Sequence, residues 1–154
     1  MERCISVNTI RVLLLCCIGI MPCAEAFAAQ REVVLVVAAN SPLHEMDSLE
    51  IRKIYLGFTV KRNGKNIRGL LNTSNSTLND IFLQSVVAMT DKSYRRRLLS
   101  MTLRQGIPRP ATYDDLIRLQ DALLANPYNV TYMWKESADR MTDVRILRVL
   151  WRKN

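Results

Sequence analysis

A loop that opens into a helix is encoded by Asn72-Thr73-Ser74-Asn75-Ser76-Thr77-Leu78-Asn79-Asp80-Ile81-Phe82. The first six residues are small and polar, and apolar residues then recur at helical spacing as far as Met89. The pattern predicts a helix over residues 77–89. Ser76 or Thr77 is expected to cap this helix, and Asp80 is placed to reach back as in a capping box.

This loop is the candidate functional site of the chain. Residues 67–71 form a short strand candidate that would deliver the loop to the edge of a sheet. The free N–H groups and the positive dipole end of a helix favour an oxyanion, and such sites occur at the carboxyl edge of α/β sheets. We therefore predict an oxyanion site made of Ser74, Asn75, Ser76, Thr77 and Asn72. A capped turn without a ligand explains the same residues, and this alternative stays open.

Buried strands and amphipathic helices alternate along the rest of the chain. The apolar, β-branched run over residues 33–39 is typical of a strand buried on both faces. The other predicted strands lie at 67–71, 130–134 and 144–151, and the other predicted helices at 48–56, 91–103 and 116–124, with a short turn or helix near 136–141. This order predicts the α/β class, as a three-layer sandwich with a small, mostly parallel sheet.

Residues 1–29 have the pattern of a secretory signal peptide. Arg3 and Arg11 supply positive charge, and the apolar core over residues 12–21 is shorter than the roughly 20 residues that span a bilayer. Small residues before position 30 offer cleavage sites. We therefore predict a periplasmic protein whose single domain covers residues 30–154. A retained N-terminal anchor helix is an alternative.

All four cysteines lie in this predicted leader, at Cys4, Cys16, Cys17 and Cys23. The predicted mature chain can therefore form no disulfide and no thiolate zinc site, so it must fold on its hydrophobic core. A lipoprotein acylated at Cys23 or Cys17 is a further alternative, although the residues before both cysteines match a small-residue acylation signal poorly.

The chain is basic, with 22 lysines and arginines, 14 acidic residues and a formal net charge of +8. The predicted leader is electrically neutral, so the excess positive charge belongs to the mature part. Such a surface favours anionic partners in general, such as phosphate, phospholipid head groups and acidic proteins. The remaining length of about 125 residues is near the usual size of one domain.

The sequence offers little for catalysis or for cofactors. His44 is the only histidine, the glycines stand alone, and no metalloprotease, nucleophile-elbow or nucleotide-loop motif occurs. We expect no enzyme activity, no cofactor and no metal, with His44 on the surface. Arg95-Arg96-Arg97 would spread around a helix, which is typical of a solvated face, so nucleic acid is not an expected partner.

Several motifs resemble the phosphate-binding-protein branch of periplasmic solute-binding proteins, which have the type 2 periplasmic binding fold and serve ABC uptake systems. Ser48-Leu49-Glu50-Ile51-Arg52-Lys53-Ile54-Tyr55-Leu56-Gly57 is similar to the family's S-L-x-E-L-x-x-I-F/Y-L-G helix. Asn63-Gly64-Lys65-Asn66-Ile67 is similar to its D-G-x-x-I turn, and Asn126-Pro127-Tyr128-Asn129-Val130-Thr131-Tyr132-Met133 to its P-G-A-I-G-Y-V turn. The resemblance runs from Val33 to about Val149 and implies one lobe of a fold that normally has two.

The polar loop is where the chain departs from that family. The family's R-x-D-G-S-G-T loop holds phosphate through an arginine, an aspartate, hydroxyls and backbone N–H groups. Asn72 stands in the place of the arginine, Ser74 in the place of the aspartate, and Ser76 keeps its residue type. Because a bidentate arginine contact is stronger than a neutral hydrogen bond, phosphate binding is expected to be weaker by roughly a few kcal/mol.

The combined features predict a secreted, non-enzymatic, single-lobe protein of the solute-binding type. The resemblance implies weak binding of phosphate or another oxyanion, and an ABC permease or another envelope protein as partner. The alternative is a periplasmic adaptor without a small-molecule ligand, whose basic surface docks on an envelope protein or a lipid head group.

Overall fold

The structure is a computed structural model that describes residues 31–153. The predicted signal peptide, with Cys17 and Cys23, lies outside the described residues. The strands are β1 (Glu32–Ala38), β2 (Val60–Arg62), β3 (Lys65–Asn72), β4 (Ala111–Tyr113), β5 (Asn129–Trp134) and β6 (Val144–Arg152). The helices are α1 (Ser48–Tyr55), α2 (Ser76–Phe82), the π-helical turn η1 (Leu83–Val87), α3 (Asp91–Gln105), α4 (Leu116–Leu124) and α5 (Lys135–Asp139).

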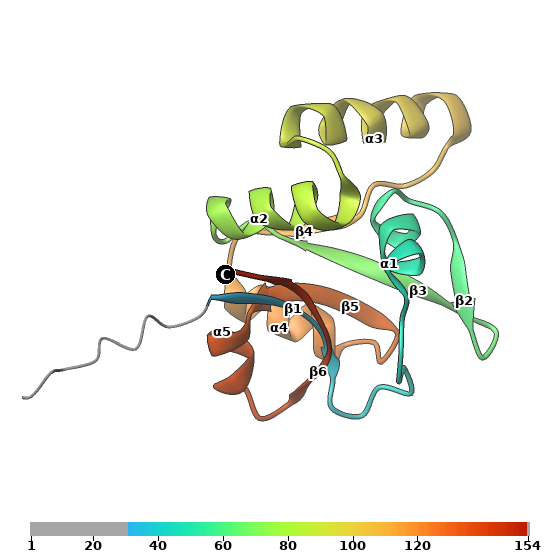
Figure 1. Cartoon of the computed structure of the whole chain (residues 1–154). Helices are drawn as coiled ribbons and strands as arrows, with labels where there is room; N and C mark the ends of the chain where they lie inside the picture. Colours follow the sequence, from blue (N-terminus) through green and yellow to red (C-terminus); the bar gives the residue numbers. More distant parts are fainter. Residues whose placement is uncertain (1–30, 154) are drawn as a thin grey trace, which may run out of the picture.

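The strands form one mixed sheet in the order β2-β3-β5-β1-β6, with β4 also paired to β3 (Figure 1). β3 is parallel to β4 and β5, whereas β1 is antiparallel to both of its neighbours and β2 is antiparallel to β3. β3, β4, β5 and β6 therefore share one direction. The predicted α/β class is confirmed, and the pairing is more mixed than the expected mostly parallel sheet.

A hairpin causes this difference in pairing. β2 lies in a segment where the sequence pattern predicts only a turn, and the Asn63-Gly64 turn joins it to β3. Both turn residues have positive φ, at 51° and 73°, as a tight hairpin turn requires. The hairpin reverses the chain before β3 begins, so β3 runs opposite to β1 rather than parallel to it.

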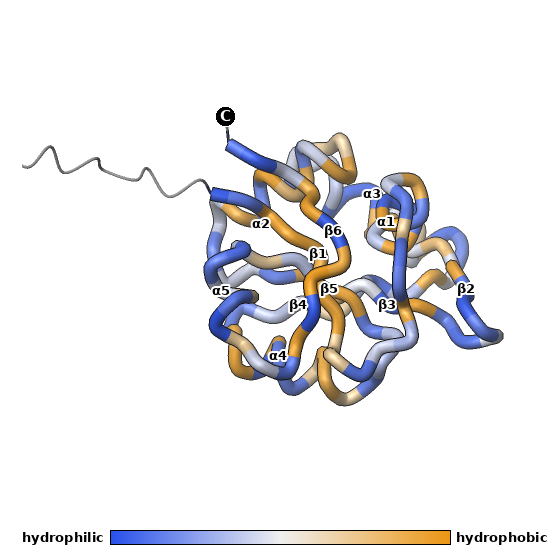
Figure 2. The backbone as a smooth tube through the Cα atoms, turned by 60° about the horizontal axis from the view of Figure 1, so that its bottom comes forward, coloured by the Kyte–Doolittle hydropathy of each residue, from blue (hydrophilic) through white to orange (hydrophobic). Residues whose placement is uncertain are grey.

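β1 is the centre of the molecule, and all seven of its residues are buried. Val33, Leu35 and Val37 face the core on one side of the sheet, and Val34 and Val36 face the core on the other. Helices α1 and α2 cover the first face, with α3 lying outside them, and α4 and α5 cover the second face. Figure 2 shows the hydrophobic trace of β1 within the sheet. This arrangement is the predicted three-layer sandwich.

Helix α3 is joined to the body by a narrow contact. Tyr94, Leu98 and Met101 are its buried residues, and the Tyr94 hydroxyl donates to the carbonyl oxygen of Tyr55 at 2.6 Å. The helix ends at Gly106, a predicted stop signal, which has a positive φ of 64°. Most of the remaining surface of α3 faces solvent.

Candidate functional site

The polar loop lies where β3 turns into α2. β3 ends at Asn72 and α2 begins at Ser76. The backbone N–H and the hydroxyl of Thr73 both donate to the carbonyl oxygen of Tyr113, at 2.8 and 3.1 Å, and so tie the loop to the end of β4. Because β3, β4 and β5 run in the same direction, the loop lies at their common carboxyl edge, where ligands usually bind in α/β sheets.

Asn72 is fully buried and shapes the loop from within. Its Nδ2 donates to the carbonyl oxygen of Tyr132 at 3.0 Å. Its Oδ1 accepts from the backbone N–H of Ser74 at 3.1 Å and from the Ser74 hydroxyl at 2.6 Å. The Asn72 side chain is therefore buried beneath the exposed turn. Its amide holds the turn in place through Ser74 and does not face solvent.

The helix cap is Asn75, whose side chain accepts from the backbone N–H of Leu78 at 2.9 Å. The prediction that Ser76 or Thr77 caps the helix is therefore wrong. The capping box with Asp80 is wrong as well, because the third residue of α2 is Leu78. Asn75 keeps an extended backbone, with φ −138° and ψ 118°, and this conformation is typical of an N-cap.

The structure brings Ser74, Asn75, Ser76 and Thr77 together on one exposed turn, called here the α2 turn. The first N–H groups of a helix have no acceptor within the helix. Those of Ser76 and Thr77 also lack a partner elsewhere in residues 31–153. The α2 turn therefore presents free N–H groups beside side-chain hydroxyls, which is an arrangement that can hydrogen-bond an oxyanion.

Two buried aromatic rings support the α2 turn. Tyr132 stacks on Phe82, with ring centroids 3.6 Å apart and an interplanar angle of 4°. The Tyr132 hydroxyl lies 3.1 Å from the carbonyl oxygen of Asn72 and 2.8 Å from Oδ1 of Asn79. Since a hydroxyl has one hydrogen, it cannot donate to both groups at once. With the Asn79 amide turned, the hydroxyl donates to the Asn72 carbonyl oxygen and accepts from the Asn79 Nδ2. Burial raises the pKa of Tyr132 well above its ordinary value.

The α2 turn has no positively charged side chain, so only the backbone dipoles of the helix would attract an anion to it. Asp80 is the only charged residue between positions 72 and 82, and it is exposed. An exposed helix N-terminus stabilises an anion by only about 0.3–1 kcal/mol. The geometry of the α2 turn therefore offers an anion only a weak attraction.

The α2 turn lines none of the four best-defined open pockets among residues 31–153. The one of about 670 Å³ at the β2–β3 hairpin, called here the hairpin pocket, is lined by Lys61, Lys65, Arg68 and Tyr128 among others. Its lining has three basic side chains and no acidic one. The sequence showed Lys61 and Lys65 beside a turn, but only the fold brings Tyr128 to them.

The single histidine lies on the surface, as expected. His44 is exposed and lines a pocket with Asp47 and Glu50, but Glu50 is already bound by Arg62 at 2.7 Å. Within residues 31–153, no group of three histidine, cysteine or acidic residues could hold a metal ion. No helix in the same range is long and apolar enough to cross a membrane.

Comparisons with known proteins find a likeness among solved structures. No family model matches the chain, and no curated protein matches it. Among solved structures, the chain resembles the crystal structure of an ABC-type phosphate transport receptor from Vibrio cholerae, with a TM-score of 0.55 and 14% sequence identity. The likeness covers 77% of this chain but only 46% of the receptor chain. At this identity it shows the fold alone, which is an α/β architecture consistent with one lobe of a periplasmic binding protein.

Proposed function

We propose that the chain is an exported, single-lobe protein of the solute-binding type that binds phosphate or a similar oxyanion weakly at the α2 turn. One observation carries this proposal. The free N–H groups of Ser76 and Thr77 lie at the carboxyl edge of three strands of common direction, beside exposed hydroxyls. The structural likeness to a phosphate transport receptor supports an oxyanion as the class of solute.

The binding is expected to be weak because the turn is open. A second lobe would exclude water and add contacts, and the chain spans less than half of the receptor that it resembles. The α2 turn offers an anion neutral hydrogen bonds and a helix dipole, without an arginine. A dissociation constant on the order of 1 mM corresponds to about 4 kcal/mol of binding free energy, which is a reasonable scale for such contacts.

Asn72 acts as a positioning residue in this proposal. Its buried amide fixes Ser74 and contacts the β5 backbone at Tyr132, so it sets the shape of the α2 turn without touching the anion. This role differs from the direct ligand role expected for position 72 from the family resemblance.

Calorimetric titration with phosphate and with sulfate tests the proposal. Ser76→Pro removes both the hydroxyl and the N–H at the first position of α2, where proline is well tolerated. Ser48→Pro is the matched control, because Ser48 is the exposed first residue of α1. We expect a binding heat at millimolar anion that is retained in the control and lost in Ser76→Pro. Equal heats in both variants would contradict the α2 turn as the site.

Export is part of the same proposal. A protein recovered from the periplasmic fraction should begin between Phe27 and Gln30, since small residues precede these positions. Mass spectrometry of the recovered chain measures this start directly. A chain that retains Met1, or one that carries a lipid on Cys23 or Cys17, would contradict cleavage at this point.

A second function is an adaptor without a small-molecule ligand, whose basic surface docks on an envelope protein or a lipid head group. The observation that favours it is the large exposed surface of α3, which carries Arg95, Arg96 and Arg97. In the calorimetric experiment, no heat with either anion at millimolar concentration would favour the adaptor. If the protein binds an oxyanion at the α2 turn, the expected protein partner is an ABC permease.

A further inference from the structure

Helix α3 concentrates positive charge on one element. It holds five basic residues, Lys92, Arg95, Arg96, Arg97 and Arg104, and one acidic residue, Asp91. Arg95 pairs with Asp91 at 2.8 Å, and the other four basic side chains form no ion pair within residues 31–153. The helix therefore contributes a net charge of +4, which is half of the formal net charge of +8 of the whole chain.

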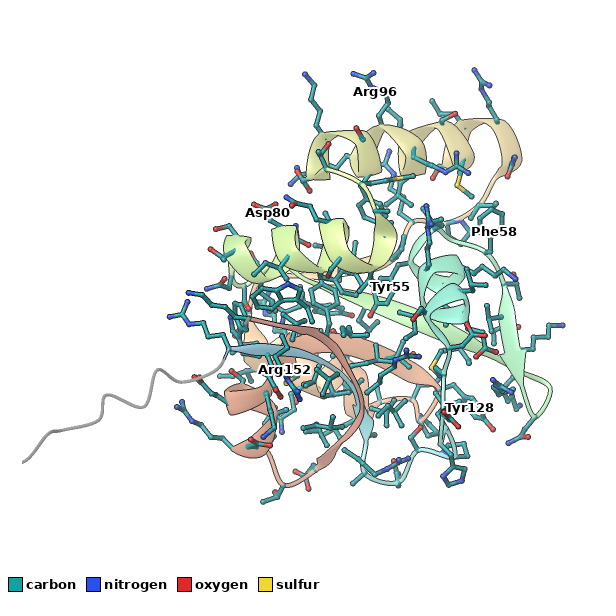
Figure 3. All side chains as sticks on the ribbon, viewed as in Figure 1. Tyr55, Phe58, Asp80, Arg96, Tyr128 and Arg152 are labelled. Atoms are coloured by element: carbon teal, nitrogen blue, oxygen red, sulfur yellow. The ribbon has the colours of Figure 1, made fainter. Side chains whose placement is uncertain are left out.

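Two exposed leucines lie among these charges. Leu99 is 43% exposed and Leu103 is 76% exposed. At about 3.6 residues per turn, they share one stripe with Lys92 and Arg96, opposite the buried residues of the helix. Arg95 lies on one flank of this stripe, whereas Arg97 and Arg104 lie further round the helix, in the groove beside Phe58. Figure 3 shows Arg96 pointing away from the rest of the molecule.

An aromatic side chain adds to the apolar surface beside α3. Phe58 is 44% exposed and lines a shallow groove of about 640 Å³ together with Arg97 and Arg104. Single exposed apolar residues are common on protein surfaces. Here Phe58 lies beside the basic flank of α3 and the two leucines lie on its outer stripe. Basic side chains of this density are attracted to the negative surface of a membrane that contains anionic lipids.

We propose that the outer face of α3, formed by Lys92, Arg96, Leu99 and Leu103 with Arg97 and Arg104 at its side, docks on an anionic phospholipid surface. The basic side chains contact lipid phosphates, and the leucines enter the layer beneath them. Basic side chains spread along and around two exposed leucines fit a plane of many mobile anions better than one fixed anionic site. The α2 turn takes no part in this contact, so the inference does not depend on phosphate binding; it rests on the adaptor function and names the partner of that surface.

Other occupants fit the outer face of α3 less well. A second copy of this chain would bring two strongly basic helices together, and like charges repel. An acidic protein would satisfy the charges, and it is treated as an outcome of the test.

Vesicle co-sedimentation of the full chain tests the proposal. The vesicles contain phosphatidylglycerol and phosphatidylcholine in equal parts, or phosphatidylcholine alone. One variant combines Arg96→Gln, Arg97→Gln and Arg104→Gln, and another combines Leu99→Ser and Leu103→Ser. The matched control combines Lys61→Gln, Lys65→Gln and Arg68→Gln, which remove the same charge at the hairpin pocket. All of these side chains are exposed, and circular dichroism checks the fold of each variant.

We expect binding to the anionic vesicles and little binding to phosphatidylcholine alone. The arginine variant should lose on the order of a hundredfold in affinity, because each basic residue near the surface contributes to the attraction. The leucine variant should lose about tenfold. The control at the hairpin pocket should remain close to the wild type.

Four results would overturn the proposal. Equal loss in the hairpin control would show that net charge alone drives binding. No loss in the leucine variant would reduce the contact to an attraction for any polyanion. Equal binding to phosphatidylcholine would show that the contact does not require anionic lipid. Full release from the vesicles by polyglutamate at matched charge would favour an acidic protein as the partner.

Discussion

Tyr132 links the α2 turn to the core, and its hydroxyl is expected to contribute measurably to the free energy of unfolding. Tyr132→Phe removes the hydroxyl that contacts the backbone of Asn72 and the side chain of Asn79. Because these buried groups lose a partner, the free energy of unfolding should fall by about 1–3 kcal/mol. Urea denaturation measures the change. Tyr128→Phe is the control, because Tyr128 is only partly buried, and an equal loss there would contradict the role of Tyr132.

Three buried tyrosines predict how the protein responds to alkaline pH. Burial raises the pKa of Tyr55, Tyr94 and Tyr132 above the ordinary value of about 10, and for Tyr55 the neighbouring tyrosines raise it further. A folded-state pKa above the unfolded one means that the folded state holds its protons more tightly. The resulting stability is fully present below about pH 10 and is lost as the pH rises above that value.

The expected observation is that these three tyrosines ionise only when the protein unfolds. Tyrosinate absorbance and far-ultraviolet circular dichroism, recorded together from neutral to strongly alkaline pH, measure both events. Ionisation of all the tyrosines with the dichroism unchanged would contradict the burial of this cluster.

The residue that caps α2 could not be predicted from the sequence alone. The run Asn72-Thr73-Ser74-Asn75-Ser76-Thr77 contains several good N-cap residues, and local preference does not rank them. The choice of Asn75 follows from a contact of the folded chain, since the buried amide of Asn72 holds Ser74 ahead of the helix. The junction itself was predictable, and the separate role of Asn72 was not.

At the scale of elements, the start of α2 depends on its cap. Asn75→Ala removes the acceptor of the Leu78 N–H and should lower the free energy of unfolding by about 1 kcal/mol. Ser76→Ala should have a much smaller effect, because the Ser76 hydroxyl caps nothing. Thermal or urea unfolding compares the two variants. A larger loss for Ser76→Ala would restore the cap predicted from the sequence.

The end of α1 depends on Gly57 in a similar way. Gly57 has φ 85°, and the N–H of Phe58 bonds to the carbonyl oxygen of Lys53, which closes the helix. A Cβ at position 57 would lie 2.9 Å from Cγ2 of Ile107. Gly57→Ala should therefore combine backbone strain of about 1–2 kcal/mol with a steric clash that costs a further 1 kcal/mol or so.

Gly64→Ala is the matched control for this prediction. Gly64 also has a positive φ, at 73°, but a Cβ at that position would meet no atom within 4 Å, so only backbone strain is expected. Urea denaturation should show the greater loss for Gly57→Ala. Equal losses in the two variants would mean that Ile107 moves aside at little cost.

Element positions were largely predictable, and strand directions were not. The apolar run of β1, the helical periods of α1 and α4 and the glycine ends of α1 and α3 all appear in the sequence and are confirmed. β2 and β4 have only three residues each and give no clear pattern. β2 forms the hairpin that reverses the chain before β3. Because β2 was not predicted, the antiparallel direction of β1 could not be predicted either.

At the scale of the whole molecule, helices cover both faces of one mixed sheet, and the exposed α2 turn lies at the edge of that sheet. The resemblance recognised from the Ser48–Gly57 motif agrees with the fold of a phosphate transport receptor, although sequence identity to that structure is 14%. The basic hairpin pocket could not be predicted, because Lys61, Lys65 and Tyr128 are brought together by the pairing of distant segments. That pocket competes with the α2 turn as a place for a small anion, because its lining has three basic side chains and no acidic one.

Residue-resolved nuclear magnetic resonance decides between these two places most directly. Phosphate is titrated to millimolar concentration into isotope-labelled protein at constant pH and ionic strength, and the backbone amide shifts are followed. If the α2 turn binds the anion, the amides of Asn75, Ser76 and Thr77 move together along one binding curve, while those of Lys61, Lys65 and Arg68 stay in place. Shifts confined to the hairpin pocket, or no saturable shift at the α2 turn, would contradict binding there.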